Sequence, residues 1–408
     1  MRLGAAALAL VLAASAIGGT AAPAATQQAE GESYSGAFVE FETTGAAVSD
    51  YAVDGSVVVE SVTAQSASET EGNLGAGVDA VTSVNGSVVG VDSSGAAGAT
   101  VTTESGAEME AHDNERGVLQ VHANGESQVV EASVSGEAES ESDGRVVVSN
   151  DDGSQGAFVV VGDGEVTTNE DGDVVAQIDG DGRLVYRQYN EGRTDEDETQ
   201  EQLIQDGTAT AEVYVNGAAE SGSEAEGEAT SVVEYGQDTS VEVQERSESQ
   251  VNMTVERIES QGKVIITTVS ESAVENAENL EVYVDGEAAA QANSYSEVRS
   301  ATQDGDQSRY LVRQDSSAEA STDVVVGINQ FSERQVSLQS AEDGGETTET
   351  EDDSMDDGSE TTETEDGSTG GSGDDTDGGD TDGDGAGFGV VAALVALAAA
   401  LVAVRNRH

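Results

Sequence analysis

Cysteine and tryptophan are absent from this 408-residue chain, and its single proline is Pro23. Without cysteine the chain can form neither disulfides nor thiolate metal sites. Aromatic residues make up only 3% of the sequence, so a folded core must be built from Val, Ala, Ile and Leu. No proline after Pro23 interrupts a possible strand.

Basic residues are also scarce. The chain has 15 Lys and Arg against 82 Asp and Glu, for a formal net charge of -67, and Lys263 is its one lysine. Such a charge excludes a phosphate-binding basic surface, so we expect no nucleic-acid partner. At about 1 M salt the Debye length falls to about 3 Å and repulsion becomes local, which indicates a salty environment. Intrinsic disorder of residues 30–340 is the competing interpretation of this composition.

The first 25 residues have the pattern of a secretory signal peptide. Arg2 precedes an apolar stretch from Leu3 to Ile17, and small residues around Pro23 form a cleavage site. We therefore predict export, with an uncleaved N-terminal anchor as the alternative.

A second apolar stretch lies at the other end of the chain. Counted from Gly387 to Val404 it reaches roughly 27 Å as a helix, enough to cross the hydrocarbon core. Arg405 and Arg407 follow and would stop the helix on the cytoplasmic side, leaving the preceding chain outside. Before it, residues 341–385 are rich in Asp, Glu, Thr, Ser and Gly, which predicts a disordered acidic stalk.

This tail resembles the PGF-CTERM sorting signal of haloarchaeal surface proteins, in residues 341–408 together with the leader. Gly387 and Phe388 match the family's motif, whereas its proline is Ala386 here. The resemblance implies processing by an archaeosortase and a membrane-lipid anchor. A retained transmembrane helix would place the protein at the same cell surface.

Between residues 30 and 340 the sequence alternates with period two around turn dipeptides. Asn-Gly and Asp-Gly supply the positive φ angles of type I′ turns, so their flanks should pair as hairpins. The dipeptides in β-branched surroundings begin at Asp54, Asn85, Asn216 and Asp285. The predicted fold class is mostly β, with repeated hairpins in antiparallel sheets that are sandwich-like or solenoid-like.

Two short helices are expected, over 194–205 and 270–279. Each follows a strand and precedes another, which suggests a degenerate repeat of about 70 to 80 residues, with biased composition as the alternative. The predicted domains are the leader (1–25), an N-terminal β region (26–140), a β-rich ectodomain (141–340), the stalk (341–385) and the sorting motif with its helix and basic tail (386–408).

Carboxylates gather in several turns and are weak candidates for a Ca²⁺ site. Residues 380–385 begin like a calcium loop, but the twelfth position is Val391, so the loop cannot close. The turns with Asp171 and Asp173, and with Asp179 and Asp181, are better placed. In so acidic a chain solvated turns are the expected outcome, and no metal site is predicted.

No nucleophile–base pair or phosphate-binding loop is recognisable, and His112 and His122 have no cysteine near them in sequence. Asn85 and Asn252 begin sequons for N-linked glycans. We therefore expect a non-enzymatic, surface-anchored structural or adhesive envelope protein of a halophilic archaeon. Its partners would be membrane lipid, a processing archaeosortase, and other envelope proteins or glycans. The alternatives are a surface module that binds cations or a solute, and a surface hydrolase.

Overall fold

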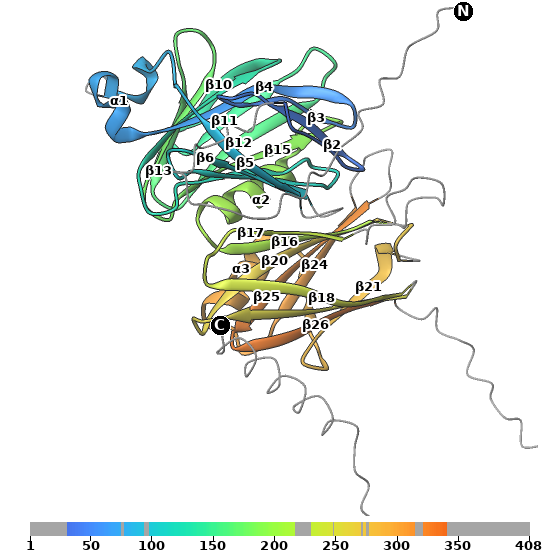
Figure 1. Cartoon of the computed structure of the whole chain (residues 1–408). Helices are drawn as coiled ribbons and strands as arrows, with labels where there is room; N and C mark the ends of the chain where they lie inside the picture. The colour runs from blue at the N-terminus through green and yellow to red at the C-terminus, as the bar shows by residue number, and fades with distance from the viewer. Residues whose placement is uncertain are drawn as a thin grey trace, which may run out of the picture. The chain divides into compact units, whose positions relative to one another are not determined.

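The computed structural model describes residues 31–74, 77–93, 98–216, 230–247, 249–270, 272–274, 277–314 and 321–340. Within these ranges the chain is mostly β and forms four sheets, which confirms the predicted fold class (Figure 1). Two sandwiches follow one another along the chain. The N-terminal sandwich contains sheets 1 and 2, and the C-terminal sandwich contains sheets 3 and 4.

The N-terminal sandwich is antiparallel throughout its described strands. In spatial order, sheet 1 contains β1 (Ser33–Ser35), β2 (Val39–Thr43), β3 (Val48–Val53), β4 (Ser56–Ser66), β9 (Gln128–Val134), β14 (Val174–Ile178) and β13 (Gly164–Thr168). Sheet 2 contains β10 (Glu137–Ser142), β11 (Arg145–Ser149), β12 (Gln155–Val161), β15 (Arg183–Tyr189), β8 (Leu119–His122), β7 (Glu108–His112), β6 (Gly98–Thr103) and β5 (Val88–Ser93).

The C-terminal sandwich includes two parallel pairs, β16 with β20 and β23 with β24. In spatial order, sheet 3 contains β17 (Thr230–Glu234), β16 (Ala209–Val215), β20 (Gln261–Ser270), β25 (Ser321–Gln330), β24 (Arg309–Gln314) and β23 (Ala290–Gln291). Sheet 4 contains β18 (Thr239–Ser247), β19 (Gln250–Arg257), β26 (Glu333–Ser340), β21 (Leu280–Val284) and β22 (Glu287–Ala288).

Two of the predicted tight hairpins are present. Asp54 and Gly55 have φ of 50° and 74° and join β3 to β4, where Val53 pairs with Ser56. Asp285 has φ of 53° and joins β21 to β22 in the same way. These angles are those a type I′ turn requires.

The hairpin predicted at Asn85 is wrong. Residues 81–87 belong to no strand, and neither Asn85 nor Gly86 has a positive φ. A Cβ on Gly86 would lie 2.4 Å from the Ala46 carbonyl oxygen and 2.6 Å from Thr63 Cγ2. This glycine therefore permits close packing of an extended segment, and it does not form a turn. Gly217, in the hairpin expected after Asn216, lies outside the described residues.

The helix predicted near 194–205 is confirmed as α2 (Asp195–Gln205). Thr194 accepts a hydrogen bond from the Asp197 backbone N–H, and the Asp197 carboxylate accepts one from the Thr194 backbone, which completes a capping box. The expected helix over 270–279 is wrong, since its described part contains turns and the short 3₁₀ helix η3 (Ala277–Asn279). Ala273, Val274 and Ala277 are instead buried in the core of the C-terminal sandwich.

Two α-helices and a 3₁₀ helix occur where none was predicted: α1 (Ala67–Leu74), α3 (Tyr295–Asp304) and η1 (Val78–Ala80). Helix α3 packs on β25, β20 and β24, with Val298 and Ala301 buried. The strand–helix–strand segments of the suggested repeat differ in structure. β15–α2–β16 passes from sheet 2 to sheet 3, whereas β20–η3–β21 passes from sheet 3 to sheet 4. The domain boundary predicted between residues 140 and 141 falls within β10, inside the N-terminal sandwich.

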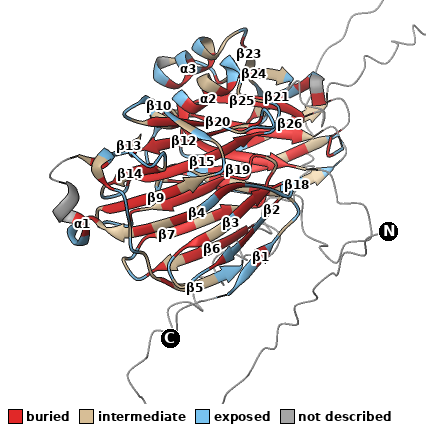
Figure 2. Cartoon of the chain, turned by 90° about the horizontal axis from the view of Figure 1, so that it is seen from above, coloured by how far each residue is buried: buried red, intermediate tan, exposed pale blue. Residues whose placement is uncertain are grey.

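Three large apolar cores occupy the layers. One lies between sheets 1 and 2, and another between sheets 3 and 4. The third joins the sandwiches, because it combines Val118 and Val185 of the first with Leu203 of α2 and with Ile266 and Val325 of the second. Figure 2 shows buried residues running through the central strands of both sandwiches.

The predicted leader, stalk, sorting motif (Ala386, Gly387, Phe388), apolar helix and basic residues (Arg405, Arg407) all lie outside the described residues. Among the helices that are described, none has the length and apolar character needed to span a bilayer.

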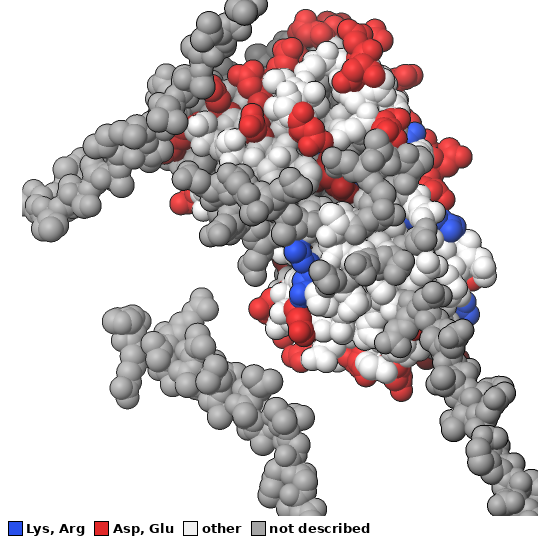
Figure 3. Space-filling view, turned by 90° about the vertical axis from the view of Figure 1, so that its right-hand side faces the viewer, with Lys and Arg blue, Asp and Glu red and all other residues white. Residues whose placement is uncertain are grey.

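Acidic residues occupy the outward positions of many strands. In β2, buried Val39 and Phe41 alternate with exposed Glu40 and Glu42, and the edge strand β10 exposes Glu137, Glu139 and Glu141. Figure 3 shows acidic side chains spread over one face of the molecule. Because like charges lie side by side on folded sheets, the fold should depend on screening by salt.

We predict that dialysis from about 3 M to about 0.05 M salt expands or unfolds residues 30–340, since the Debye length then grows from a few ångströms to more than ten. Circular dichroism should show loss of β structure, light scattering a larger hydrodynamic radius, and both should recover when salt is restored. An unchanged spectrum and radius across the series would contradict the prediction.

Candidate functional site

The largest group of buried charged residues lies where sheet 2 meets α2 and sheet 3. Strand β15 is buried on both faces: Leu184 and Tyr186 enter the N-terminal core, while Arg183, Val185 and Arg187 face the other sandwich. Alternation along a strand produces this division, since successive side chains point to opposite faces. We refer to the following residues as the buried polar cluster: Arg116, Arg187, Tyr189, Asp197, Gln200, Glu201, Glu212, Tyr214, Tyr235, Thr268 and Asp323.

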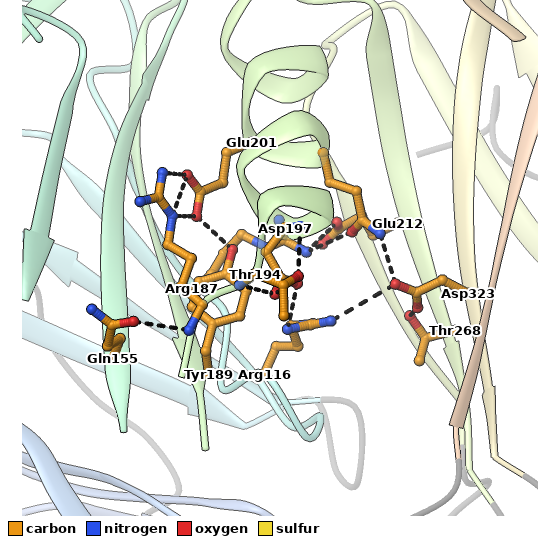
Figure 4. Close-up of polar contacts among 12 residues, drawn as sticks. Arg116, Gln155, Arg187, Tyr189, Thr194, Asp197, Glu201, Glu212, Thr268 and Asp323 are labelled. Carbon is orange, nitrogen blue, oxygen red and sulfur yellow. Dashed lines mark hydrogen bonds and ion pairs between the residues drawn. The ribbon is translucent and has the colours of Figure 1, made fainter. Parts of the chain in front are cut away.

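Arg116 connects three elements (Figure 4). It lies in the β7–β8 loop and is 7% exposed. Its Nη1 is 3.2 Å from Asp197 Oδ1 of α2, and its Nη2 is 3.7 Å from Asp323 Oδ2 of β25. The Asp323 carboxylate also accepts hydrogen bonds from Gln200 and Thr268, each at 2.7 Å. One guanidinium therefore links the N-terminal sandwich to α2 and to the C-terminal sandwich.

Arg187 and Glu212 form a second link, between β15 and β16. Arg187 Nη2 lies 2.8 Å from Glu212 Oε1, and the two side chains are 1% and 2% exposed. Glu212 Oε2 accepts hydrogen bonds from the hydroxyls of Tyr214 and Tyr235, both at 2.8 Å. Buried charges are costly unless paired and hydrogen-bonded, and this arrangement meets that requirement for the carboxylate.

The pKa shifts agree with this assignment. Burial, and secondarily the Glu212 carboxylate, raise the pKa values of Tyr214 and Tyr235 well above the ordinary value, so both hydroxyls remain donors. Burial, the largest single effect, would lower the pKa of Arg187, but Glu212 together with Tyr189, Tyr214 and Tyr235 outweighs it and the net shift is upward. Each group is therefore held in the protonation state that its partner needs.

Glu201 of α2 forms the third part of the cluster. Arg193 Nε and Nη2 donate to its two oxygens at 2.9 and 2.7 Å, and Arg145 Nη1 donates at 3.2 Å. The Tyr189 hydroxyl donates to Glu201 at 2.7 Å, and the Arg116 guanidinium lies 4.8 Å from the centre of the Tyr189 ring. Helix α2 is thus fixed to sheet 2 by a fully buried carboxylate.

Chemically, the buried polar cluster can hold two sandwiches in a fixed register. Its carboxylates accept from arginine, tyrosine, glutamine and threonine side chains of other elements, and its members are almost wholly removed from solvent. Within the described residues no three His, Asp or Glu side chains are arranged so that they could hold a metal ion.

His112 and His122 lie on β7 and β8 of sheet 2. His112 Nε2 and His122 Nε2 are 3.8 and 3.3 Å from the same oxygen, Glu110 Oε2. Burial lowers the pKa of His112 to about 4 from its ordinary 6.5. The pKa of Glu110 is also lowered, chiefly by its hydrogen bond with His122.

The four aspartates that were weak candidates for a Ca²⁺ site lie in two separate turns. Asp171 and Asp173 lie in the β13–β14 turn, where their backbone N–H groups donate to Asn169 Oδ1 and the Asp173 carboxylate accepts from Ser133 at 2.7 Å. Asp179 and Asp181 lie in the β14–β15 turn and accept from Gln177 and Gln237. Amide and hydroxyl donors of the protein already bond to the carboxylates of Asp173, Asp179 and Asp181.

The two sequon asparagines lie in different surroundings. Asn85 is exposed in the segment before β5, and Asn252 is half-buried in β19.

Sequence reasoning did not find the buried polar cluster. A signal was present, since Arg183, Arg187 and Arg193 occur within 11 residues of a chain with only 15 basic residues. Apart from the partners on α2, the carboxylates that pair with the cluster's arginines are distant from them in sequence. The pattern alone could therefore not pair Arg187 with Glu212 or Arg116 with Asp323.

Replacement of Glu212 by Gln should lower the free energy of unfolding by about 3–5 kcal/mol, because Arg187 is then left buried without its counter-charge. The amide oxygen still accepts from the tyrosines, so the change isolates the charge. The double variant Arg187→Met/Glu212→Gln should recover much of this loss, since it buries no unpaired charge.

Denaturant unfolding in high salt measures these differences, with Glu242→Gln as a matched control on the exposed face of β18. The control should stay within about 0.5 kcal/mol of the parent. Equal stability of the Glu212→Gln variant and this control would show that the pair does not hold the sandwiches together.

Acid should destabilise the fold through His112. The unfolded chain binds this proton near pH 6.5 and the folded chain only near pH 4, so the free energy of unfolding falls as the pH drops between these values. The loss is on the order of 3 kcal/mol. Glu110, whose pKa is lowered, acts in the same direction as the pH falls further.

Unfolding curves from pH 7 to pH 4 should therefore have a shallower pH dependence in His112→Gln than in the parent chain. Above pH 6.5 the two slopes should coincide, which provides an internal control. Parallel slopes over the whole range would contradict the assignment.

Comparisons with known proteins do not place the chain in a family. No family model matches it, and neither does any curated protein. Among solved structures it is similar to a family 81 glycoside hydrolase from Clostridium thermocellum, with a TM-score of 0.35 and 12% identity. That match covers 77% of this chain and 38% of the hydrolase chain, so the chain spans less than two-fifths of that protein.

Proposed function

We propose that this chain is a cell-surface-anchored structural or adhesive envelope protein of a halophilic archaeon, in which residues 31–340 form a rigid ectodomain. The observation that carries the proposal is the buried polar cluster. The ion pairs Arg116–Asp323 and Arg187–Glu212 of this cluster link the two sandwiches. We propose no catalytic role for them.

Rigidity follows from how the sandwiches are joined. The contact surface combines an apolar core around Ile204 and Tyr214 with the ion pairs of Arg116 and Arg187. Buried pairs are screened by salt much less than exposed ones. A contact of this kind between the sandwiches remains stable at high salt, where surface ion pairs contribute little.

The location of the ectodomain is argued from the sequence. The leader, the acidic stalk of residues 341–385 and the apolar run after Phe388 favour an exported protein held at the membrane. Tandem β-sandwiches are common in cell-surface proteins, and a stalk would lift them from the bilayer. Membrane lipid, a processing archaeosortase and neighbouring envelope proteins or glycans are the partners that this proposal implies.

Removal of residues 386–408 should release the protein from the envelope. In a halophilic archaeal host, the full chain should fractionate with membranes, and the chain ending at residue 385 should appear in the medium. Immunodetection of an epitope placed in the stalk measures both.

The matched control is Gly387→Ala/Phe388→Ala, which changes the sorting motif and keeps the apolar run. If an archaeosortase processes the tail, this variant should keep its unprocessed mass and remain with membranes. A full chain found wholly in the medium or the cytosol would contradict the proposal.

A further inference from the structure

The sequon at Asn85 lies in an extended segment outside the sheets. Residues 81–87 connect η1 to β5 and pair with no strand. The Asn85 backbone N–H donates to Gln65 Oε1 at 3.0 Å, which fixes the segment beside β4. In the described structure, the Asn85 side-chain amide and the Ser87 hydroxyl take part in no hydrogen bond, and Asn85 is exposed.

Gly86 keeps this segment against the sheet. Its Cα faces the Ala46 carbonyl and Thr63 so closely that no side chain fits there. The middle residue of the sequon is therefore packed against protein and half-buried, whereas Asn85 is exposed. An acceptor asparagine in an extended, unpaired segment is accessible to an enzyme after folding as well as before it.

A polar groove adjoins Asn85. Its volume is about 500 Å³, within the range of small-molecule sites, and Asn85 and Ser87 both line it. Ser66, Ser105, Glu104 and Glu126 are also in its lining. Carboxylates accept hydrogen bonds from hydroxyls, and serine hydroxyls both donate and accept, so the groove suits the hydroxyl groups of a sugar.

Asn252 has none of these features. It lies in β19, which pairs with β18 on one side and β26 on the other, opposite Glu245 and Ser337. Its side-chain oxygen accepts a hydrogen bond from Gln250 at 2.7 Å. Modification after folding would require the strand to leave the middle of sheet 4.

We propose that Asn85 carries an N-linked glycan whose first sugars lie in this groove, and that Asn252 is unmodified. In the reaction, the Asn85 side-chain nitrogen forms a bond to the anomeric carbon of a lipid-linked oligosaccharide phosphate. The bond from that carbon to the phosphate oxygen breaks, the lipid phosphate leaves, and the amide loses one proton. The inference rests on the export that the proposed function includes.

Mass spectrometry of the full chain, expressed in a halophilic archaeon, tests the assignment. Cleavage after glutamate suits a chain with so few basic residues. Asn85→Gln and Ser87→Ala should abolish the glycopeptide, Ser87→Thr should retain it because the sequon survives, and Asn252→Gln should leave the glycan mass unchanged. Hydrogen exchange in residues 64–69 should be slower in the glycosylated chain than in Asn85→Gln.

Each outcome bears on one claim. Exported protein with its leader removed and Asn85 bare would overturn this inference and leave the proposed function standing. A glycan at Asn252 would overturn it too. Equal hydrogen-exchange rates in residues 64–69 of the glycosylated chain and of Asn85→Gln would contradict the placement of the first sugars in the groove. Protein confined to the cytosol would overturn the proposed function together with this inference.

Discussion

Burial of charge between the two sandwiches is the constraint on which the arrangement of this molecule depends. A lone arginine or carboxylate in such a place would cost several kcal/mol, so each must meet a partner from another element. Arg187 meets Glu212, and Arg116 meets both Asp197 and Asp323. A shift of one sandwich against the other would break these pairs together, and this makes the buried polar cluster a determinant of register as well as of stability.

The same constraint explains how a chain with so few cations uses them. Arg116, Arg187 and Arg193 are buried or nearly so, and they form ion pairs with carboxylates of the same molecule. The outward positions are left to carboxylates such as Glu40 and Glu137, with little compensation. Buried pairs are screened by salt much less than exposed ones, whereas the acidic outer surface needs salt to screen its repulsion. The buried arginines therefore stabilise the contact between the sandwiches, and the exposed carboxylates keep the surface soluble.

Features encoded by neighbouring residues could be predicted from the sequence. The turns at Asp54 and Asp285 follow from the φ preference of Asp-Gly, and α2 follows from Thr194 and the acids of its first turn. The same reasoning failed at Asn85, because Gly86 is required by packing against Ala46 and Thr63, which are distant in sequence. It failed again at 270–279, where apolar residues complete a core. Tertiary packing decided both cases.

The buried polar cluster could not be predicted because its pairs span very different distances along the chain. Within the described residues the chain passes once from the N-terminal to the C-terminal sandwich, through β15, α2 and β16. Contacts within that passage, such as Arg193 with Glu201, are local and need little loop closure. The contact of Arg116 with Asp323 joins residues 207 positions apart and requires the two sandwiches to pack against each other. Helix α2 takes part in contacts of both kinds. Its Glu201 bonds to nearby Arg193, and its Asp197 and Gln200 contact Arg116 and Asp323, so the connection between the sandwiches also contributes to the contact between them.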